Sequence, residues 1–579
     1  VRLQLLCMIV LAASRFAFGQ SVVDISQGWR FIQGDDDAWS AIDAEDSDWQ
    51  EIEIGKPWEQ QGYADYAGFA WYRLHICIPE SVREQEAFRL SESLLLSLGR
   101  IDDVDATWFN GTKIGDTGAF PPEFESAWNE PRVYRIPASL IRWNKDNVIA
   151  VRVYDGLFDG GMVLGPYSLR IADLNDLVAF EWILNEGGGL FSGDDAVGFI
   201  ANLRNDSPTG IDGELLWTLR TDEGETVSRS SDRVTLAPNS VTPITRTFAP
   251  SVPGFYDVHG VLRSAVHDVE LEWTKVIGYR AEDIKSPLTR EADFDSFWNE
   301  TLEALSDVDP EFDMRPRADR DSPTHEVFEV TMRSLGGVRV RGWYERPKEA
   351  DHVPALLRVP GYGGNMQPSG EGKPIAIFSF NPRAHGNSQD DVPGQPRDYW
   401  IRGLDDKQGY YYQGAYADCV RAVDFLASRS EIDSSRIGIT GESQGGGLSL
   451  ATAALDDRIS LCAPDIPFLC DWVKYFKASH WPEMDRWIAA ETGRSWETTL
   501  RTLSYFDTLN MAERIDCPVL LNLGVQDPVC PAATVFAVFD RIPGRKEFRA
   551  YPNTAHRVEA EYRAFQREWI WQEFNRAPD

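Results

Sequence analysis

Residues 436–454 have the sequence RIGITGESQGGGLSLATAA, in which an apolar segment, a glycine-flanked Ser443 and a run of small residues follow one another. The pattern Gly-x-Ser-x-Gly between a strand and a helix predicts a sharp turn that holds the serine hydroxyl away from the backbone. The flanking glycines let the strand and the helix pass closely. The five-residue pattern alone is a weak signal, and the strand and helix around it give it weight. This stretch therefore predicts a serine nucleophile at a strand-to-helix turn.

A nucleophilic serine needs a base, and the base needs a carboxylate that orients it. In a parallel sheet that carries such a serine turn, the acid and the base follow the serine in sequence. They lie on loops after later strands, and the acid comes first. The apolar segment 519–523 leads into Asp527, and segment 546–551 leads into His556. We therefore predict a triad of Ser443, Asp527 and His556, against the alternatives of a turn-capping aspartate and a loop histidine bonded to backbone. The other histidines of this part of the chain do not follow a strand after the acid: His325, His352, His385 and His480.

Acyl transfer at such a serine also needs two N–H donors aimed at the developing oxyanion. One is expected from the backbone of Gln444, directly after the nucleophile. The loop 359–364, VPGYGG, follows an early strand, and its glycines let the backbone turn inward. We assign the second donor to the backbone N–H of Tyr362, and the alternative for this loop is an ordinary glycine-rich turn.

Residues 284–579 alternate apolar strands with longer helical segments, which predicts one α/β-hydrolase domain. This domain resembles carbohydrate esterase family 7, the acetyl xylan esterases and cephalosporin C deacetylases. The resemblance implies hydrolysis of small acyl groups, chiefly acetyl, from the hydroxyls of an acetylated oligo- or polysaccharide by a Ser-Asp-His triad without a cofactor. It rests on the stretches DFDSFW (293–298), GYGG (361–364), YADCVRAVDFL (416–426), GESQGG (441–446), IPFLC (466–470) and DPVCP (527–531).

Two positions depart from the family pattern. The family usually carries Arg-Gly-Gln where this chain has Arg383-Ala384-His385, and it usually has Glu directly after the catalytic histidine, where this chain has Arg557. Neither change removes a member of the predicted triad. They leave open the range of substrates and the oligomeric packing.

Residues 21–175 show short alternating segments separated by turn residues, which predicts an antiparallel β-sandwich. They resemble the jelly-roll sugar-binding domain at the front of family 2 glycoside hydrolases, and the resemblance implies a galactose-binding-like fold without showing that this copy binds sugar. Residues 176–283 predict an immunoglobulin-like sandwich, which we interpret as a spacer. The jelly-roll resemblance is carried by WRF (29–31), PW (57–58), GFAWYR (68–73) and WFNG (108–111).

Residues 1–20 predict a secretory signal peptide, because Arg2 precedes an apolar run and small residues end the segment. A membrane anchor is disfavoured because the run is short and Arg15 interrupts the segment. We therefore expect export to the periplasm or the medium, and no membrane span elsewhere in the chain.

The chain is strongly acidic, with a formal charge of −34. Such a charge disfavours nucleic acid and anionic membranes as partners, and its simplest explanation is solubility. The turn Asp35-Asp36-Asp37 offers calcium ligands, but a solvated acidic turn is the simpler interpretation.

Six cysteines follow the signal segment without metal-ligand spacing. We expect them to be buried thiols, although export would permit a disulfide. They are Cys77, Cys419, Cys462, Cys470, Cys517 and Cys530.

Two other functions stay open. A prolyl-oligopeptidase-like serine peptidase also has β structure before its α/β-hydrolase domain, but that β structure is a propeller, and no blade repeat occurs here. A non-catalytic carbohydrate-binding surface protein would be expected to have lost part of the triad. A family 2 glycosidase is disfavoured because residues 284–579 lack the strand-helix rhythm of an eight-stranded barrel. The glycan, the acyl position and the oligomeric state are not predicted.

Overall fold

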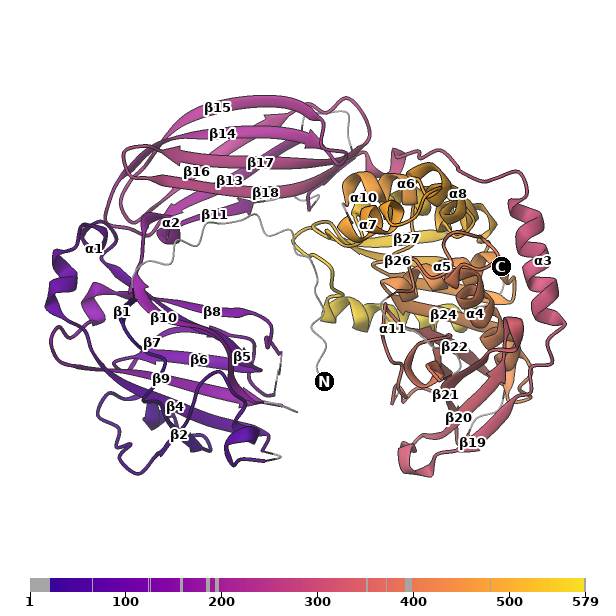
Figure 1. Cartoon of the computed structure of the whole chain (residues 1–579), viewed down its shortest axis with the longest axis horizontal. Coiled ribbons are helices and arrows are strands. Elements are labelled where there is room, and N and C mark those ends of the chain that lie inside the picture. Colours follow the sequence, from indigo (N-terminus) through magenta and orange to yellow (C-terminus); the bar gives the residue numbers. More distant parts are fainter. Residues whose placement is uncertain are drawn as a thin grey trace.

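The computed structural model describes residues 21–576 except 65, 123, 125, 157–159, 184–187, 193–196, 350–351, 371, 391–397 and 480. Figure 1 shows three regions arranged in an arc, two built of strands and one built of strands and helices, with the second β region between the other two. The predicted signal peptide and His480 lie outside the described residues. Within the described part of the chain, no helix has the length and apolar character needed to cross a membrane.

The first β region consists of two antiparallel sheets with one apolar core between them. The core takes Phe31 and Tyr72 from the larger sheet and Leu96 and Leu169 from the smaller one. The larger sheet has the order β3 (Gln50–Glu51), β2 (Arg30–Gln33), β4 (Gly68–Cys77), β9 (Asp146–Asp155), β6 (Val104–Phe109), β7 (Thr112–Thr117). The smaller has β1 (Ser21–Val23), β10 (Gly161–Ile171), β5 (Ser93–Asp102), β8 (Pro131–Pro137), and helix α1 (Glu86–Ser91) lies at its end.

The structure bears on two expectations from the sequence, one about the acidic turn at residues 35–37 and one about the cysteines. In the acidic turn, Asp35 accepts from Arg152 Nε at 2.7 Å and Asp36 accepts from the backbone N–H of Ala38 at 2.9 Å, so both carboxylates bond within the protein. The expectation that all six cysteines are buried is wrong for Cys77, which ends β4 exposed to solvent, and for Cys517, which is only partly buried. All six are free thiols.

The second β region begins with α2 (Leu174–Leu177) and also has two sheets. Its core gathers around the buried Trp217 and includes Phe199 and Ile277 from the two sheets. The three-stranded sheet has the order β11 (Val178–Ile183), β13 (Val197–Asn205), β16 (Ser240–Phe248). The five-stranded sheet has β12 (Leu190–Phe191), β18 (Val269–Tyr279), β17 (Gly254–Ser264), β14 (Ile211–Thr221), β15 (Thr226–Leu236).

The third region is a nine-stranded sheet covered by helices on both faces. The alternation of apolar strands and helices that the sequence predicts is present, and in the sheet order from β23 to β27 each strand runs parallel to its neighbour. The order is β19 (Asp313–Pro316), β20 (His325–Arg333), β21 (Arg339–Pro347), β23 (Ala376–Asn381), β22 (Val353–Val359), β24 (Ile432–Glu442), β25 (Ile459–Asp465), β26 (Val519–Gly524), β27 (Lys546–Tyr551). A mostly-β front followed by an α/β-hydrolase fold is thereby confirmed.

The helices of this region divide between two apolar cores. The larger core joins α3 (Phe294–Ser306), α4 (Tyr411–Ala427), α5 (Gln444–Leu455) and α10 (Ala532–Arg541) to one face of the sheet. The smaller core joins α11 (Ala560–Phe574) to the other face. The segment between β25 and β26 holds four short helices, α6 (Trp472–Ala478), α7 (Pro482–Ala489), α8 (Trp496–Ser504) and α9 (Thr508–Met511). The carboxyl ends of β24, β26 and β27 lead into the loops that carry the predicted site residues.

Candidate active site

Ser443 lies between the end of β24 and the start of α5, with φ 57° and ψ −116°. A positive φ is strained for a residue with a side chain, and the surroundings must hold it. The Ser443 N–H donates to Asp465 O at 2.9 Å, and its carbonyl accepts from the N–H of Phe468 at 2.9 Å. Gly445 passes so close to β22 that an added Cβ would lie 2.5 Å from Val359 O. The predicted strand-turn-helix geometry is therefore present, and the glycine is required by the close approach.

The structure brings Ser443, Asp527 and His556 together. His556 Nε2 lies 3.1 Å from Ser443 Oγ, and His556 Nδ1 lies 2.7 Å from Asp527 Oδ2. Asp527 is 5% exposed, on the loop between β26 and α10, and His556 is half-buried between β27 and α11. The other carboxylate oxygen of Asp527 accepts from the backbone N–H groups of Val529 at 2.8 Å and Cys530 at 2.9 Å.

These bonds fix the tautomer of the His556 imidazole. Because Asp527 Oδ1 is held by two backbone donors, its Oδ2 faces Nδ1, which must carry the proton. His556 Nε2 is then free of a proton and can accept one from Ser443. This is the arrangement in which a histidine acts as a general base toward a serine hydroxyl.

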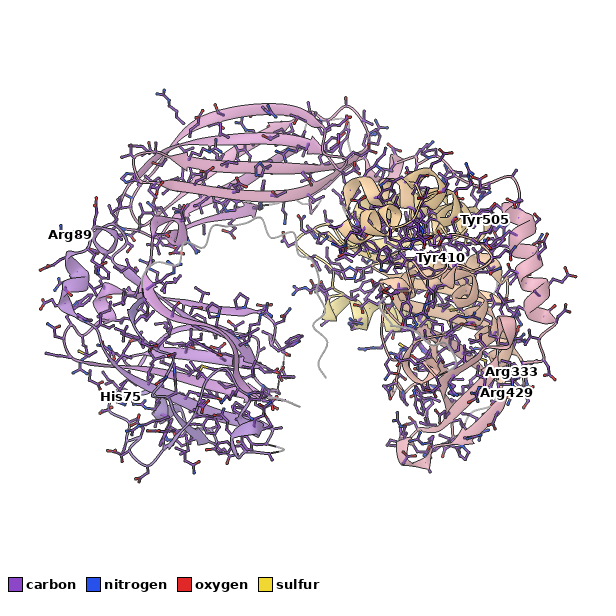
Figure 2. The ribbon with its side chains drawn as sticks, in the orientation of Figure 1. His75, Arg89, Arg333, Tyr410, Arg429 and Tyr505 are labelled. Atoms are coloured by element: carbon purple, nitrogen blue, oxygen red, sulfur yellow. The ribbon has the colours of Figure 1, made fainter. Side chains whose placement is uncertain are left out.

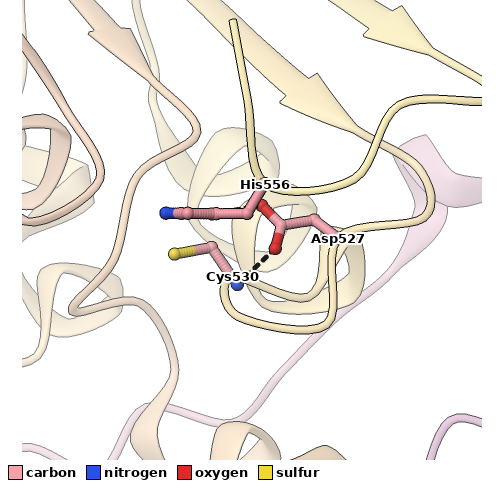
Figure 3. Close-up of side chains that lie close together, drawn as sticks. All are labelled: Asp527, Cys530 and His556. Carbon is pink, nitrogen blue, oxygen red and sulfur yellow. Dashed lines mark hydrogen bonds and ion pairs between the residues drawn. The ribbon is translucent and has the colours of Figure 1, made fainter. Parts of the chain in front are cut away.

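Cys530 lies beside the triad, and Figure 3 shows its thiol next to the imidazole of His556 and the carboxylate of Asp527. Complete burial raises the pKa of the Cys530 thiol well above its usual range. Since the thiolate is the nucleophilic form of a cysteine, this raised pKa disfavours a nucleophilic role for the sulfur. Its contribution is its backbone N–H, which helps to orient the acid.

The two predicted oxyanion donors come from different segments. Gln444 directly follows Ser443, and the loop that carries Tyr362 borders Ser443. Gln444 is the first residue of α5 and is 1% exposed. Tyr362 follows β22, in a turn closed by the bond from Gly364 N–H to Gly361 O at 2.9 Å. An added Cβ at Gly361 would lie 4.0 Å from Ser443 Cβ, so this loop borders the serine. The ring of Tyr362 packs against Tyr399 with centroids 5.0 Å apart.

One buried residue at this site was missed by the sequence reasoning. His385 is fully buried, and its Nε2 lies 3.0 Å from the side-chain Nε2 of Gln444. The Gln444 oxygen accepts from Tyr412 at 2.9 Å, so the amide nitrogen must donate to His385. The other ring nitrogen, Nδ1, then donates to the Tyr411 hydroxyl at 3.1 Å, which in turn donates to Arg383 O at 2.9 Å.

This chain of bonds leads from helix α4 to the residue after the nucleophile. Tyr410, directly before α4, lies inside the α/β region (Figure 2), and the helix supplies Tyr411 and Tyr412 from its first turn. Burial lowers the pKa of His385 to about 4, so the ring is neutral at pH 7, as its acceptor role requires. The departure from the family's Arg-Gly-Gln was the only sequence signal for this position.

The arginine that this segment retains has a separate partner. Arg383 forms two bonds to the buried carboxylate of Asp418 on α4, both 2.8 Å long. Gly414 makes room for it, because a Cβ there would lie 2.1 Å from the guanidinium. Bidentate pairs of this kind fix geometry as well as charge. The pair anchors the segment that presents His385 to α4.

Comparison with known proteins shows the family of the chain. The family model for acetyl xylan esterase matches residues 266–573, more than half of the chain. The chain belongs to the acetyl xylan esterase family. It is a carboxylic ester hydrolase that removes acetyl groups.

Three proteins to which the chain is similar are acetyl esterases or acetyl xylan esterases. The acetyl esterase Axe7A of Xylanibacter ruminicola is 29% identical over 337 residues, which are 55% of this chain and 74% of that protein. The acetyl xylan esterase of Paenibacillus sp. R4 is 32% identical, covering 51% of this chain and 98% of that one, with a TM-score of 0.46. Acetyl xylan esterase 1 of Thermoanaerobacterium sp. JW/SL YS485 is 25% identical, with the same two coverages and a TM-score of 0.47.

Proposed function

We propose that this esterase is exported and removes acetyl groups from acetylated oligo- or polysaccharides, with Ser443 as nucleophile, His556 as general base and Asp527 as the orienting acid. One observation carries the assignment: the imidazole of His556 bridges the serine hydroxyl and the carboxylate, at 3.1 Å and 2.7 Å. A histidine in this position can take the hydroxyl proton as the oxygen attacks.

The proposed reaction has two halves. In the first, His556 takes the proton of Ser443 while the serine oxygen attacks the acetyl carbonyl, and the backbone N–H groups of Tyr362 and Gln444 stabilise the oxyanion. The imidazolium then protonates the departing sugar oxygen, which leaves an acetyl-serine. In the second half, His556 takes a proton from water, the hydroxide oxygen attacks the acetyl carbon, and acetate leaves as the proton returns to Ser443.

The test of this assignment is Ser443→Ala, assayed on p-nitrophenyl acetate and on acetylated xylo-oligosaccharides. We expect loss of turnover on both substrates with unchanged circular dichroism. The matched control is Ser449→Ala, which removes a buried hydroxyl from α5, the helix that follows Ser443, and should keep wild-type turnover. Wild-type turnover by Ser443→Ala would overturn the assignment.

The peptidase alternative predicts a different substrate preference. A peptidase would cleave a peptidyl anilide faster than an acetylated sugar, and we expect the reverse. The amide needs protonation of a poorer leaving group, so this comparison separates the two activities on one preparation.

For the front of the chain we propose a jelly-roll sandwich of the galactose-binding type over residues 21–175 and an immunoglobulin-like sandwich over 176–283, before a hydrolase domain over 284–579. Support comes from two separate apolar cores, the second of which begins at Leu174.

We also propose that residues 1–20 direct export, on the strength of their charge and apolar pattern. Mass spectrometry of the secreted protein would test this, since an N-terminus upstream of residue 20 would contradict cleavage there.

A further inference from the structure

The second β region contacts the two loops that carry Asp527 and His556. Gln526, the residue before the acid, accepts from the backbone N–H of Val276 at 2.9 Å and donates to its carbonyl at 3.0 Å. The same side-chain amide donates to Pro552 O at 2.7 Å, on the histidine loop. One side chain thus joins strand β18, the acid loop and the histidine loop.

A second contact reaches the histidine loop from the same strand. Lys275, which is 7% exposed, donates from its ammonium group to Asn553 Oδ1. The turn before β12 also abuts this loop, because a Cβ at Gly188 would lie 2.9 Å from Pro552 Cγ. Two residues of the second β region, Lys275 and Gly188, therefore meet a stretch that ends three positions before His556, and Val276 is joined to it through Gln526.

The two loops are also joined to each other. The N–H of Val525 donates to Tyr551 O at 2.9 Å, and the N–H of Gln526 donates to Thr554 O at 3.0 Å. A displacement of either loop is therefore passed to the other. Strand β18 makes a firm support for both, since it pairs with β17 along its whole length from Val269 to Tyr279.

The rest of the interface lies away from the loops. The ring of Phe255 on β17 packs against Phe536 of α10 with centroids 5.6 Å apart. Lys477 of α6 pairs with Glu223 at 3.0 Å, on the turn between β14 and β15. These contacts attach the second β region to the hydrolase helices without touching the triad loops.

We propose that Lys275 and the Val276 backbone, through Gln526 and Asn553, are positioning elements of the active site, and that the second β region is a working part of the catalytic apparatus rather than a spacer. The proposal rests on the triad assigned above. Both loops are irregular segments, and an error of about 1 Å in the placement of a catalytic group can cost about a hundredfold in rate. Their alignment depends on a strand that lies some 250 residues earlier in the chain.

The experiment compares two lysine variants of the full-length protein at the same interface. Lys275→Met removes the bond to the histidine loop and keeps the aliphatic stem, whereas Lys477→Met removes an ion pair that is remote from the triad. We expect Lys275→Met to lower kcat about fivefold with KM within about twofold of wild type, and Lys477→Met to leave both unchanged. Gln526→Leu should lower kcat further, by about tenfold, because it frees both loops.

A merely structural role would give a different pattern. If the interface served only to dock the region, Lys275→Met would lower the melting temperature and leave kcat per folded molecule at the wild-type value, which would overturn the proposal. The acidic limb of the kcat profile adds a second readout, since it reports the pKa of the catalytic base in the complex. Weaker alignment of Asp527 destabilises the imidazolium, so in Gln526→Leu this limb should move to lower pH, and in Lys477→Met it should not.

Failure of this proposal is distinguishable from failure of the triad. Wild-type activity of Ser443→Ala would overturn both the triad assignment and the positioning proposal. An inactive Ser443→Ala, combined with wild-type kcat and an unshifted limb in both Lys275→Met and Gln526→Leu, would leave the triad standing and overturn the positioning role alone.

Discussion

The serine half of the active site and its acid and histidine half are held in place by different means. Ser443 lies in one continuous strand-turn-helix stretch, and the Gln444 side chain after it is bonded within the same α/β region. Asp527 and His556 lie on loops whose neighbours include a strand of the second β region. The difference teaches that Ser443 is placed by local sequence, whereas the loops of Asp527 and His556 also have contacts to another region of the chain.

The largest effect on the second half should come from Asp527→Asn. The two backbone donors at Oδ1 would bind the remaining oxygen of the amide, which turns its NH₂ group toward His556 Nδ1. The imidazole must then carry its proton on Nε2, where it cannot accept from Ser443. We expect kcat to fall by about 10⁴-fold with the fold intact, the size typical of this change in a serine triad.

The measurement is steady-state hydrolysis of p-nitrophenyl acetate, with circular dichroism to check the fold. Asp516→Asn, on the exposed loop before β26, is the matched control and should keep wild-type turnover. A fall of less than about tenfold in Asp527→Asn would mean that the serine half works without an oriented base.

The next effect tests whether the second β region and the hydrolase region unfold as one unit. Phe255 belongs to the second β region but is 2% exposed inside the core that contains the hydrolase helices. Phe255→Ala should destabilise the protein by about 3 kcal/mol, and Phe255→Leu by about 1 kcal/mol. The check is urea unfolding followed by tryptophan fluorescence and by loss of esterase activity. If activity survives to the wild-type urea midpoint while fluorescence shifts, the hydrolase region is independent of the β region.

The sequence was sufficient for the parts that are coded locally. The elbow at Ser443 follows from glycine spacing, and Asp527 and His556 follow from their positions after apolar segments, because both signals lie within a few residues of the side chain concerned. The contacts of Gln526 and Lys275 could not be predicted, since their partners lie in other regions and no spacing rule relates them. His385 was predicted not to be the base, and its bond to Gln444 joins segments that lie 59 residues apart, so no local pattern could reveal it.

A smaller effect on the serine half should come from His385→Leu. This change leaves the amide nitrogen of Gln444 buried without its acceptor, and the side chain must shift, carrying the adjacent oxyanion N–H with it. Loss of a whole oxyanion donor costs about a hundredfold or more in kcat, so a misplaced one should cost about tenfold. His385→Gln, the residue usual in the family, offers both a donor and an acceptor and should restore kcat. If kcat falls equally in both variants, the role is packing alone.

The smallest effect concerns how the free energy of unfolding falls in acid, and it also comes from His385. Burial lowers the pKa of His385 from 6.5 to about 4, so below pH 6.5 the unfolded chain binds a proton that the folded chain refuses. The contribution of His385 to stability is therefore complete above pH 6.5 and declines as the pH falls toward 4. At pH 5.5 this decline amounts to roughly 1 kcal/mol relative to pH 7.5, because pH 5.5 lies one unit below the pKa of the unfolded histidine and one pKa unit corresponds to a free energy of that order. His385→Gln should lack it, so the stability difference between wild type and variant, measured by urea unfolding at both pH values, should change by that amount. An unchanged difference would mean that the buried ring titrates normally, and the neutral acceptor assigned to Gln444 would have to be abandoned.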